Sequence, residues 1–433
     1  MPASALSVKA VVMSHTIPPG ASAPPQASAD PSEPVFAWYQ QMLATEPVRR
    51  DEQGVWHVFR HADVMRVLGD PATFSSDTRV VLPEPEREDL SLFARGNIVN
   101  MDPPRHREVR ALVNQVFTPR VVAGLEPRIS EVTTSLLDAA DDASEGKAAF
   151  DLVDALAYPL PVTVIAELLG VPAEDMAVFR RWADGLFSVQ VSDATVLPTE
   201  EMTEQVVPIM REMSDYLLLH IRARRDAPAD DLLGRLTTAR VGDEVLEDEE
   251  IVGLSAVLLL AGHITTTALL GNAVLSFDRH PDAWAEVRAD RSLLPAAIEE
   301  VLRHRAPFPR LGRVTTTEVE LGGRTLGPRE LVIPWVAAAN RDGERFPDPE
   351  RFDIHRGAGG HLAFGHGIHF CLGAPLARLE GRVALGLLMD RYDEIAVDHE
   401  HARYQNPWVM NSLMSLPVRA RRAAARRSPV AGT

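Results

Sequence analysis

The 433-residue chain contains a single cysteine, Cys371, and this scarcity restricts both its environment and its chemistry. One thiol cannot build an internal disulfide framework, so nothing indicates an oxidising compartment and we expect a cytoplasmic protein. Basic residues are also too few to balance the acidic ones: 44 Lys and Arg stand against 61 Asp and Glu. The resulting net charge of −17 argues against a general nucleic-acid-binding surface.

Other absences narrow the possibilities further. The longest apolar run, around residues 254–261, is too short to span a bilayer, so we expect no membrane segment. The sequence has no glycine motif that would cradle the phosphates of a flavin or a nicotinamide. It also has no internal repeat and no linker that would separate two domains.

What is present is the composition of a globular protein, with 45% hydrophobic and 24% charged residues. Residues 1–34 are rich in Pro, Ala and Ser but lack the apolar core of an export signal, which predicts a disordered leader. We expect residues 35–418 to form one folded domain, long enough to bury a large core. Residues 419–433 then form a basic, flexible tail.

Apolar residues recur with the 3.6-residue period of amphipathic helices along most of this domain. The predicted helices cover residues 105–117, 122–139, 160–169, 201–224, 249–277, 293–304 and 374–392. Strand-like segments are few and short, at residues 55–59, 313–321, 331–335 and near the C-terminus. The sequence therefore predicts a mainly α fold with a small β region.

Cys371 lies in a glycine-containing segment that runs directly into a predicted helix. Gly365, Gly367 and Gly373 permit a tight loop whose backbone can approach a flat cofactor closely. The free NH groups and the dipole at the start of the following helix would help to stabilise a thiolate. A lone cysteine is more often a small buried apolar residue, but these surroundings favour a thiolate that binds a metal.

The residues around this thiol carry a family resemblance. Phe364, Gly367, Cys371 and Gly373 reproduce the Phe-x-x-Gly-x-x-x-Cys-x-Gly signature, and the segment resembles that of the cytochrome P450 superfamily. The resemblance extends over nearly all of residues 35–418. It implies the P450 fold as the catalytic domain, a haem b bound between a long central helix and the Cys loop, and a haem-thiolate monooxygenase. It makes Cys371 the axial iron ligand and places Phe364, Gly365 and Gly373 against the haem.

Residues 251–270 are apolar on almost every face, so a helix here must run through the interior. Its polar centre matches the superfamily's Ala/Gly-Gly-x-Asp/Glu-Thr motif through Ala261, Gly262, His263, Ile264 and Thr265. The simpler interpretation is a buried helix contact whose hydroxyls are satisfied internally. The resemblance instead implies that Ala261 borders the haem and that Thr265 is catalytic, donating a hydrogen bond to dioxygen and helping to direct protons to it.

Ile264 stands where the superfamily usually has an acid, so the usual acid-alcohol proton relay is incomplete. Ordered water or a hydroxyl of the substrate is the route we favour for the missing proton. His263 is a further candidate, although we expect it to be a histidine of the core or of a helix contact.

The resemblance also implies a set of side chains that neutralise the two haem propionates by charge-assisted hydrogen bonds. His106 and Arg110 match the family's His-x-x-x-Arg, Arg313 begins a predicted strand, and His369 precedes the thiol by two residues. Each of them, taken alone, would be interpreted as an ordinary surface charge.

Glu300 and Arg303 have the spacing of a helical ion pair, which is usually a weak surface contact. The family's Glu-x-x-Arg, however, joins an arginine of a Pro-Glu-Arg-Phe segment and braces the core beside the haem. Here Arg351 supplies that arginine. We therefore expect Glu300, Arg303 and Arg351 to have a structural role.

The chemistry that the resemblance implies is reductive activation of dioxygen, with electrons from a separate ferredoxin and its NAD(P)H-dependent reductase. Four arginines flank helices expected on the thiolate side and are candidates for a docking patch on a monomeric enzyme: Arg105, Arg107, Arg378 and Arg382. Solvated charges on helix faces explain the same pattern equally well.

The substrate is expected to contact loops that vary around a fixed scaffold. By family position these are residues 80–100, 186–206 and 407–414, joined by Phe308 and Leu311. Residues 56–64, 151–162 and 261–267 resemble bacterial macrolide-tailoring members, including the isoleucine in place of the acid. We therefore expect hydroxylation of a macrolide or related polyketide in antibiotic biosynthesis. Stepwise oxidation of a methyl group to an aldehyde or acid, a peroxide-driven oxygenase and a non-catalytic haem sensor stay open as alternatives.

Overall fold

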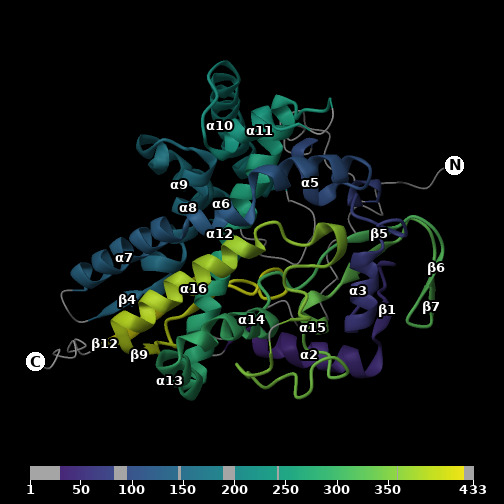
Figure 1. Cartoon of the computed structure of the whole chain (residues 1–433). Helices are drawn as coiled ribbons and strands as arrows, with labels where there is room; N and C mark the ends of the chain where they lie inside the picture. Colours follow the sequence, from purple (N-terminus) through teal and green to yellow (C-terminus); the bar gives the residue numbers. More distant parts are fainter. Residues whose placement is uncertain are drawn as a thin grey trace, which may run out of the picture.

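The computed structural model describes residues 30–81, 95–144, 148–188, 200–240, 243–357 and 359–423. Most of the expected leader, the end of the expected tail and large parts of the expected substrate segments 80–100 and 186–206 lie outside these residues. Within them the chain is mostly helical, and its strands form small sheets (Figure 1). The mainly α fold with a small β region is confirmed.

The helices are α2 (Ser32–Thr45), α3 (His61–Gly69), α5 (Arg105–Val116), α6 (Pro119–Gly124), α7 (Glu126–Ala143), α8 (Pro159–Leu169), α9 (Met176–Ser188), α10 (Glu200–Asp226), α11 (Leu232–Thr238), α12 (Asp248–Arg279), α13 (Pro281–Ala289), α14 (Leu294–His304), α15 (Val336–Ala339) and α16 (Ala374–Arg391). The strands are β1 (Val48–Arg50), β2 (Trp56–Val58), β3 (Phe74–Ser75), β4 (Ala149–Asp151), β5 (Arg313–Thr315), β6 (Val319–Leu321), β7 (Arg324–Leu326), β8 (Leu331–Pro334), β9 (Tyr392–Val397), β10 (Arg403–Tyr404), β11 (Leu413–Ser415) and β12 (Pro417–Arg422).

One expectation about a strand was wrong. Among the described residues, regular structure extends from Ser32 to Arg422, a few residues beyond each expected end of the domain at residues 35 and 418. The single strand expected at residues 313–321 is two strands, β5 and β6, that belong to different sheets. The residues between them leave the first sheet, because β6 forms a hairpin with β7 over the turn at Gly322 and Gly323, both at positive φ.

Helix α12 runs through the centre of the molecule (Figure 1) and contacts α8, α10, α14 and α16. Its first turn is closed by a capping box between Glu247 and Glu250, which satisfies backbone NH groups that a helix leaves free. Among the described residues, α12 is long and apolar enough to cross a membrane, but 61% of its most apolar window is already buried. Its apolar surface is therefore that of a core helix.

The largest sheet has five strands in the order β1-β2-β8-β5-β3, with β2 and β8 parallel and the other pairs antiparallel. All four residues of β8 are buried, as expected for a central strand covered on both faces. A second apolar core lies against this sheet and includes Phe36, Trp335 and Trp408. The larger core fills the space between the helices.

Candidate active site

The loop that carries Cys371 is held by its own backbone. The Cys371 NH donates to the Phe364 carbonyl at 2.8 Å, which closes a tight turn around Gly365 and Gly367, both at positive φ. A Cβ atom on Gly367 would lie 2.7 Å from the Leu68 carbonyl oxygen, so this position admits only glycine. The loop is therefore fixed against α3, with the thiol just before α16.

Burial raises the pKa of the Cys371 thiol above its usual value, although the Gly373 and Ala374 NH groups and Arg110 act in the opposite direction. These groups lie where a thiolate would need them, at the start of α16. Binding to a metal ion would supply the remaining stabilisation, because a coordinating thiol is deprotonated.

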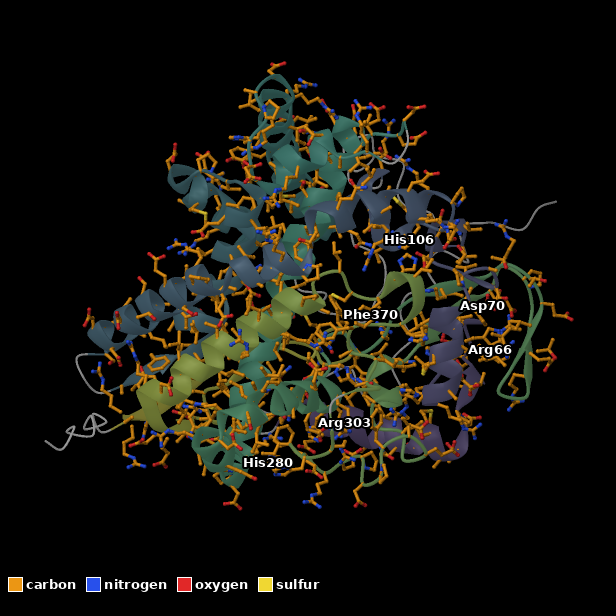
Figure 2. The ribbon with its side chains drawn as sticks, in the orientation of Figure 1. Arg66, Asp70, His106, His280, Arg303 and Phe370 are labelled. Carbon is orange, nitrogen blue, oxygen red and sulfur yellow. The ribbon has the colours of Figure 1, made fainter. Side chains whose placement is uncertain are left out.

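Four cationic or potentially cationic side chains meet beside this loop. The His106 and His369 rings lie 4.2 Å apart, and Arg110 donates to the Phe370 carbonyl at 2.8 Å. Figure 2 shows His106, on α5, above the loop that carries Phe370. Burial, followed by the charges of Arg313 and the neighbouring side chains, lowers the pKa of His369 to about 3. A protonated His369 would therefore be repelled by Arg110 and Arg313, and the structure brings the four side chains together nonetheless.

These four side chains, His106, Arg110, Arg313 and His369, form a cationic cluster. Among the described residues no carboxylate forms an ion pair with it, although Asp102 lies near enough to act against the burial that lowers the pKa of His106 and of Arg313. Within the described residues, the Nε2 atoms of His106 and His369 are buried without a hydrogen-bond partner. Arg313 is 6% exposed, its guanidinium donates to the carbonyl of the neighbouring Gly312, and burial lowers its pKa to about 10. Buried cations are costly unless they are paired, so the cluster fits an anionic group such as the propionates of a haem.

Helix α12 exposes one side at its centre. Ala261 is exposed in the middle of this otherwise buried helix, and Leu258, Ile264 and Thr265 next to it are only partly buried. The 3- and 4-residue spacing places all four on one face. This face is apolar apart from the Thr265 hydroxyl, which donates to the Ala261 carbonyl at 2.6 Å. Such a face suits a flat, apolar cofactor and an apolar substrate.

A hydrogen bond ties α12 to the helix that follows the thiol. Thr266 is bonded to the side chain of Glu380, nine residues after Cys371, and both residues are 2% exposed. Burial raises the pKa of Glu380 to about 8, so this carboxyl group is protonated at neutral pH. Sequence reasoning missed Glu380. The only signal was a carboxylate on the apolar side of the predicted helix 374–392.

His263 is 1% exposed and its ring meets that of Tyr158 edge-on at 4.3 Å. Burial lowers its pKa to about 3, so the imidazole is neutral. The expectation of a histidine in a helix contact agrees with this position.

Comparisons with known proteins agree with this geometry. The sequence model of the family described as Cytochrome P450 matches residues 51–418. The chain belongs to the cytochrome P450 family. It is 47% identical to the erythromycin C-12 hydroxylase of Saccharopolyspora erythraea over 375 residues, which are 85% of this chain and 90% of that protein. It is 45% identical to the cyclomarin C epoxidase CymV of Salinispora arenicola over 374 residues, 86% and 92% of the two chains.

The solved structures give the same result. The open form of the cytochrome P450 EryK from S. erythraea superimposes with a TM-score of 0.82 at 44% identity, covering 91% of this chain and 97% of that one. The P450 fold and the monooxygenase class of this enzyme are thereby shown. P450 enzymes use haem bound through a cysteine thiolate, and the thiol, the cationic cluster and the exposed face of α12 fit that cofactor.

Glu300 and Arg303 form the expected buried ion pair, but the arginine that joins them is not the expected one. Arg303 donates to both carboxylate oxygens of Glu300 at 2.7 and 2.8 Å, and both side chains are at most 4% exposed. The expectation that Arg351 joins them was wrong. The Arg351 side chain is exposed, and only its carbonyl accepts from Arg303. A turn brings Arg356 back instead, and its guanidinium lies 3.3 Å from Glu300.

Removing one member of this ion pair should be costly. Glu300→Ala leaves the Arg303 guanidinium buried without its carboxylate, and we expect a loss of about 3–5 kcal/mol in the free energy of unfolding. The measurement is urea unfolding of the holoenzyme followed by circular dichroism. Glu126→Ala is the control, because it removes an exposed pair with Arg382 and should cost less than about 1 kcal/mol. Equal losses in the two variants would contradict the structural role.

The buried Glu380 carboxyl group predicts a pH dependence. As the pH rises from about 4.5 to about 8, the unfolded chain loses this proton while the folded protein keeps it. Stability therefore falls by about 1.4 kcal/mol per pH unit in this window and is constant above it.

Comparing Glu380→Gln with the wild type at each pH isolates this effect. The unfolding free energy of the variant relative to the wild type should increase from pH 5 to pH 8 and then level off. Glu126→Gln removes an exposed carboxyl group whose pKa is lowered, and its difference from the wild type should be flat over the same range. A flat profile for Glu380→Gln as well would show that the Glu380 carboxyl group is not held protonated.

The four arginines considered for partner docking are mostly engaged. Arg105 pairs with Glu250 and Glu108, Arg378 with Glu299, and Arg382 with Glu126. These contacts neutralise three of the four charges, which weakens the patch as a docking site and favours the interpretation as solvated helix charges.

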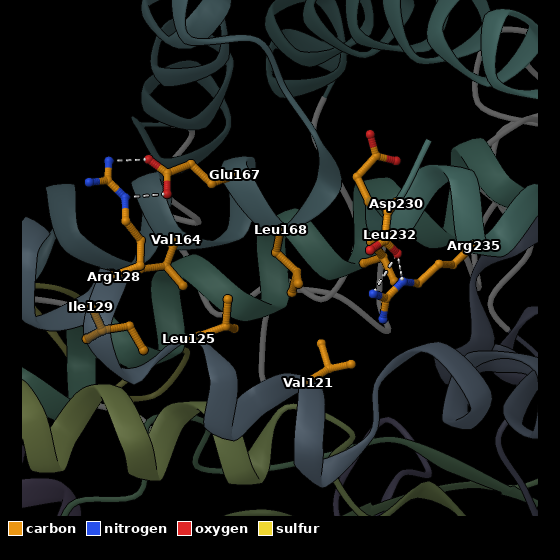
Figure 3. Close-up of a pocket in the computed structure, with 11 residues that line it drawn as sticks. Val121, Leu125, Arg128, Ile129, Val164, Glu167, Leu168, Asp230, Leu232 and Arg235 are labelled. Atoms are coloured by element: carbon orange, nitrogen blue, oxygen red, sulfur yellow. Dashed lines mark hydrogen bonds and ion pairs between the residues drawn. The ribbon is translucent and has the colours of Figure 1, made fainter. Parts of the chain in front are cut away.

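A separate pocket of about 310 Å³ lies between α6, α7, α8 and α11 (Figure 3). Its floor is apolar, with Leu125 and Leu168, and its rim carries the ion pairs Arg128–Glu167 and Arg235–Asp230. None of the residues proposed for catalysis or haem binding lines it, so it is not the active site.

Proposed function

We propose that this P450 binds haem b through the Cys371 thiolate and uses dioxygen to hydroxylate a macrolide or a related polyketide in antibiotic biosynthesis. The observation that carries the cofactor assignment is the cationic cluster next to the single thiol, which forms no ion pair with an acid among the described residues and of which His106 and Arg313 are buried. When bound, the haem supplies reductive activation of dioxygen, and thiolate donation favours cleavage of the oxygen-oxygen bond.

The protein contributes binding, charge neutralisation and proton control. Arg110, Arg313 and the two histidines of the cluster would hold the propionates by charge-assisted hydrogen bonds. Phe364, Gly365 and Gly373 would pack against the ring on the thiolate side, and Ala261 on the other. Rotation of the Thr265 side chain would redirect its hydroxyl from the Ala261 carbonyl toward the position where dioxygen is activated.

Activation of dioxygen requires protons, and Ile264 cannot supply them in place of the usual acid. Ordered water and a substrate hydroxyl are the sources we favour. His263 is an unsuitable donor, because burial keeps its imidazole neutral and its ring lies against Tyr158.

The likeness to the erythromycin C-12 hydroxylase supports the macrolide assignment. The 45% identity to the cyclomarin C epoxidase supports one alternative reaction, in which oxygen is transferred to a double bond rather than inserted into a C–H bond. Stepwise oxidation of a methyl group requires no further residues and is distinguished by aldehyde and acid products. A peroxide-driven oxygenase would work without a reductase, and a haem sensor would bind ligand without forming product.

Electrons come, in this proposal, from a separate ferredoxin and its NAD(P)H-dependent reductase, and the enzyme acts as a cytoplasmic monomer. The test is turnover of a macrolide panel with ferredoxin, reductase and NADPH under ¹⁸O₂. One ¹⁸O atom in a hydroxylated macrolide is expected. Product formed only when hydrogen peroxide replaces the reductase system, or no product from any macrolide that binds, would overturn the proposal.

A further inference from the structure

Three of the six tryptophans of the chain form one aromatic array in the second apolar core. The Trp38 ring lies 5.1 Å from that of Trp335 and 5.1 Å from that of Trp408, and Trp335 and Trp408 are 6.2 Å apart. All three contacts are edge-to-face. Trp335 and Trp408 are 0% and 6% exposed, whereas Trp38 is only partly buried. The array therefore extends from the interior toward the surface.

The inner end of the array lies directly behind a segment expected to line the substrate pocket. The Leu311 NH donates to the Pro334 carbonyl and the Ala337 NH to the Pro309 carbonyl, on either side of Trp335. The Asn411 NH, close to Trp408 in sequence, donates to the Pro307 carbonyl at 2.8 Å. Phe308, on the same segment, is 39% exposed. The expected pocket segment at residues 307–311 is thus bonded directly to the chain around Trp335, and Trp408 itself belongs to the expected pocket segment 407–414.

The outer end is formed by α2. Figure 1 shows α2, which carries Trp38, beside α15, which follows Trp335, and the two helices are in contact.

Trp335 also has a hydrogen-bond partner that simple packing does not require. Its indole NH donates to Nδ1 of His57 at 3.0 Å, and Nε2 of His57 lies 2.9 Å from the Asp51 carboxylate. An indole NH can only donate and a carboxylate can only accept, so the imidazole is neutral with its proton on Nε2. Asp51 is itself fixed by the NH groups of Gln53 and Val55. His57 can therefore act as a base toward the Trp335 indole, and the Asp51 carboxylate would stabilise the imidazolium that forms.

The charges around Trp335 show why such a base matters. The Arg310 guanidinium lies 5.3 Å from the centre of the Trp335 ring. A positive charge there opposes a second positive charge on the indole. Loss of one electron from Trp335 is therefore eased if the indole proton leaves at the same time. His57 accepts it, and Asp51 stabilises the imidazolium that forms.

We propose that Trp335, Trp408 and Trp38 form a redox relay that carries electrons from solution to the active site when oxygen has been activated without substrate. The relay rests on the proposed function only because that function generates the oxidant. It would protect the enzyme from oxidising its own haem and side chains.

The relay passes one electron at a time, and each electron transfer from Trp335 is accompanied by a proton transfer. Trp335 gives one electron to the active-site oxidant, its N–H bond breaks, and an N–H bond forms at Nδ1 of His57. Trp38 then returns an electron to Trp335, either directly or through Trp408, whose ring contacts both, and Trp335 recovers its proton from His57. A dissolved thiol re-reduces Trp38 and releases its proton to water. Two passages convert two thiols to one disulfide and, with two protons, reduce the active-site oxygen atom to water.

The first test treats substrate-free holoenzyme with a peracid and follows radicals by freeze-quench electron paramagnetic resonance, with oxidised residues located by peptide mass spectrometry. The wild type should give a tryptophan radical and oxidation at Trp38, and added thiol should slow haem bleaching several-fold. Trp335→Phe should lose the radical and the thiol protection. Trp284→Phe, in a buried tryptophan outside the array, is the control and should match the wild type. A radical and thiol protection unchanged in Trp335→Phe would overturn the relay.

Two further variants keep the test decisive if Trp335→Phe does not fold. Trp38→Phe changes the partly exposed end and should also abolish thiol protection. His57→Asn retains an oxygen acceptor for the indole NH but removes the base. With a ruthenium photo-oxidant in solution, the wild type should form the neutral tryptophan radical and His57→Asn the cation radical. A cation radical in the wild type would contradict the role of His57.

This photochemical arm needs no oxygen activation, so it separates the relay from the proposed function. An enzyme that hydroxylates a macrolide but gives no tryptophan radical contradicts the relay alone.

Discussion

We expect the Cys371→Ser variant to form no product, and its reduced carbon monoxide complex to lack the thiolate-type Soret band. The reason is that no second cysteine exists in the chain to replace the ligand. A neutral hydroxyl donates far less electron density to the iron, so cleavage of the oxygen-oxygen bond loses its driving force. The measurement is the reduced carbon monoxide difference spectrum together with product analysis.

The serine side chain is close in size to that of cysteine. The loop is held by the hydrogen bond from the backbone NH of residue 371 and by its glycines, not by the thiol. We therefore expect circular dichroism like that of the wild type. A variant that folds and still shows the thiolate-type band would eliminate Cys371 as the ligand.

The second large effect is expected at Thr265, whose hydroxyl lies on the exposed face of α12. Without it, protons no longer reach activated oxygen at the correct position. A positioned proton donor contributes about 10²–10⁴-fold, so product formed per NADPH should fall by roughly tenfold or more in Thr265→Ala. NADPH consumption should continue, with peroxide as the alternative product.

Thr267→Ala is the matched control for this experiment. The Thr267 hydroxyl makes the same type of bond within α12, to the His263 carbonyl at 3.1 Å, but it is buried and lies off the exposed face. Thr267→Ala should form as much product per NADPH as the wild type. If Thr265→Ala is equally well coupled, the hydroxyl has no role in proton delivery.

The family resemblance of the sequence rests on short, contiguous motifs, and these motifs name most of the candidate site residues. The Cys371 loop and the Ala261–Thr265 segment are contiguous, and glycine and threonine have clear conformational consequences there. Helical spacing alone predicts that Glu300 and Arg303 pair, whereas their role in the core was expected only from the family resemblance. Each of these motifs is short, so no long-range geometry is needed to recognise it.

What the sequence could not predict depends on contacts between distant segments. Arg351 and Arg356 are only five residues apart and both lie far from Glu300 in the chain, so only the turn between them decides which guanidinium points inward. Glu380 is protonated because α12 and α16 pack together. The array of Trp38, Trp335 and Trp408 joins three segments that share no pattern. Pairing of surface arginines with acids from other helices likewise removed most of the expected docking patch.

The most direct test of the central claim is a Soret-band titration of the purified holoenzyme with glycosylated and unglycosylated macrolides, using fatty acids and cyclic peptides as comparators. A substrate that displaces the water on the iron shifts the spin state, so a saturable low-spin to high-spin shift is expected with a macrolide. Silence with every macrolide, together with such a shift for a fatty acid or a cyclic peptide, would contradict the macrolide assignment and move it to that class.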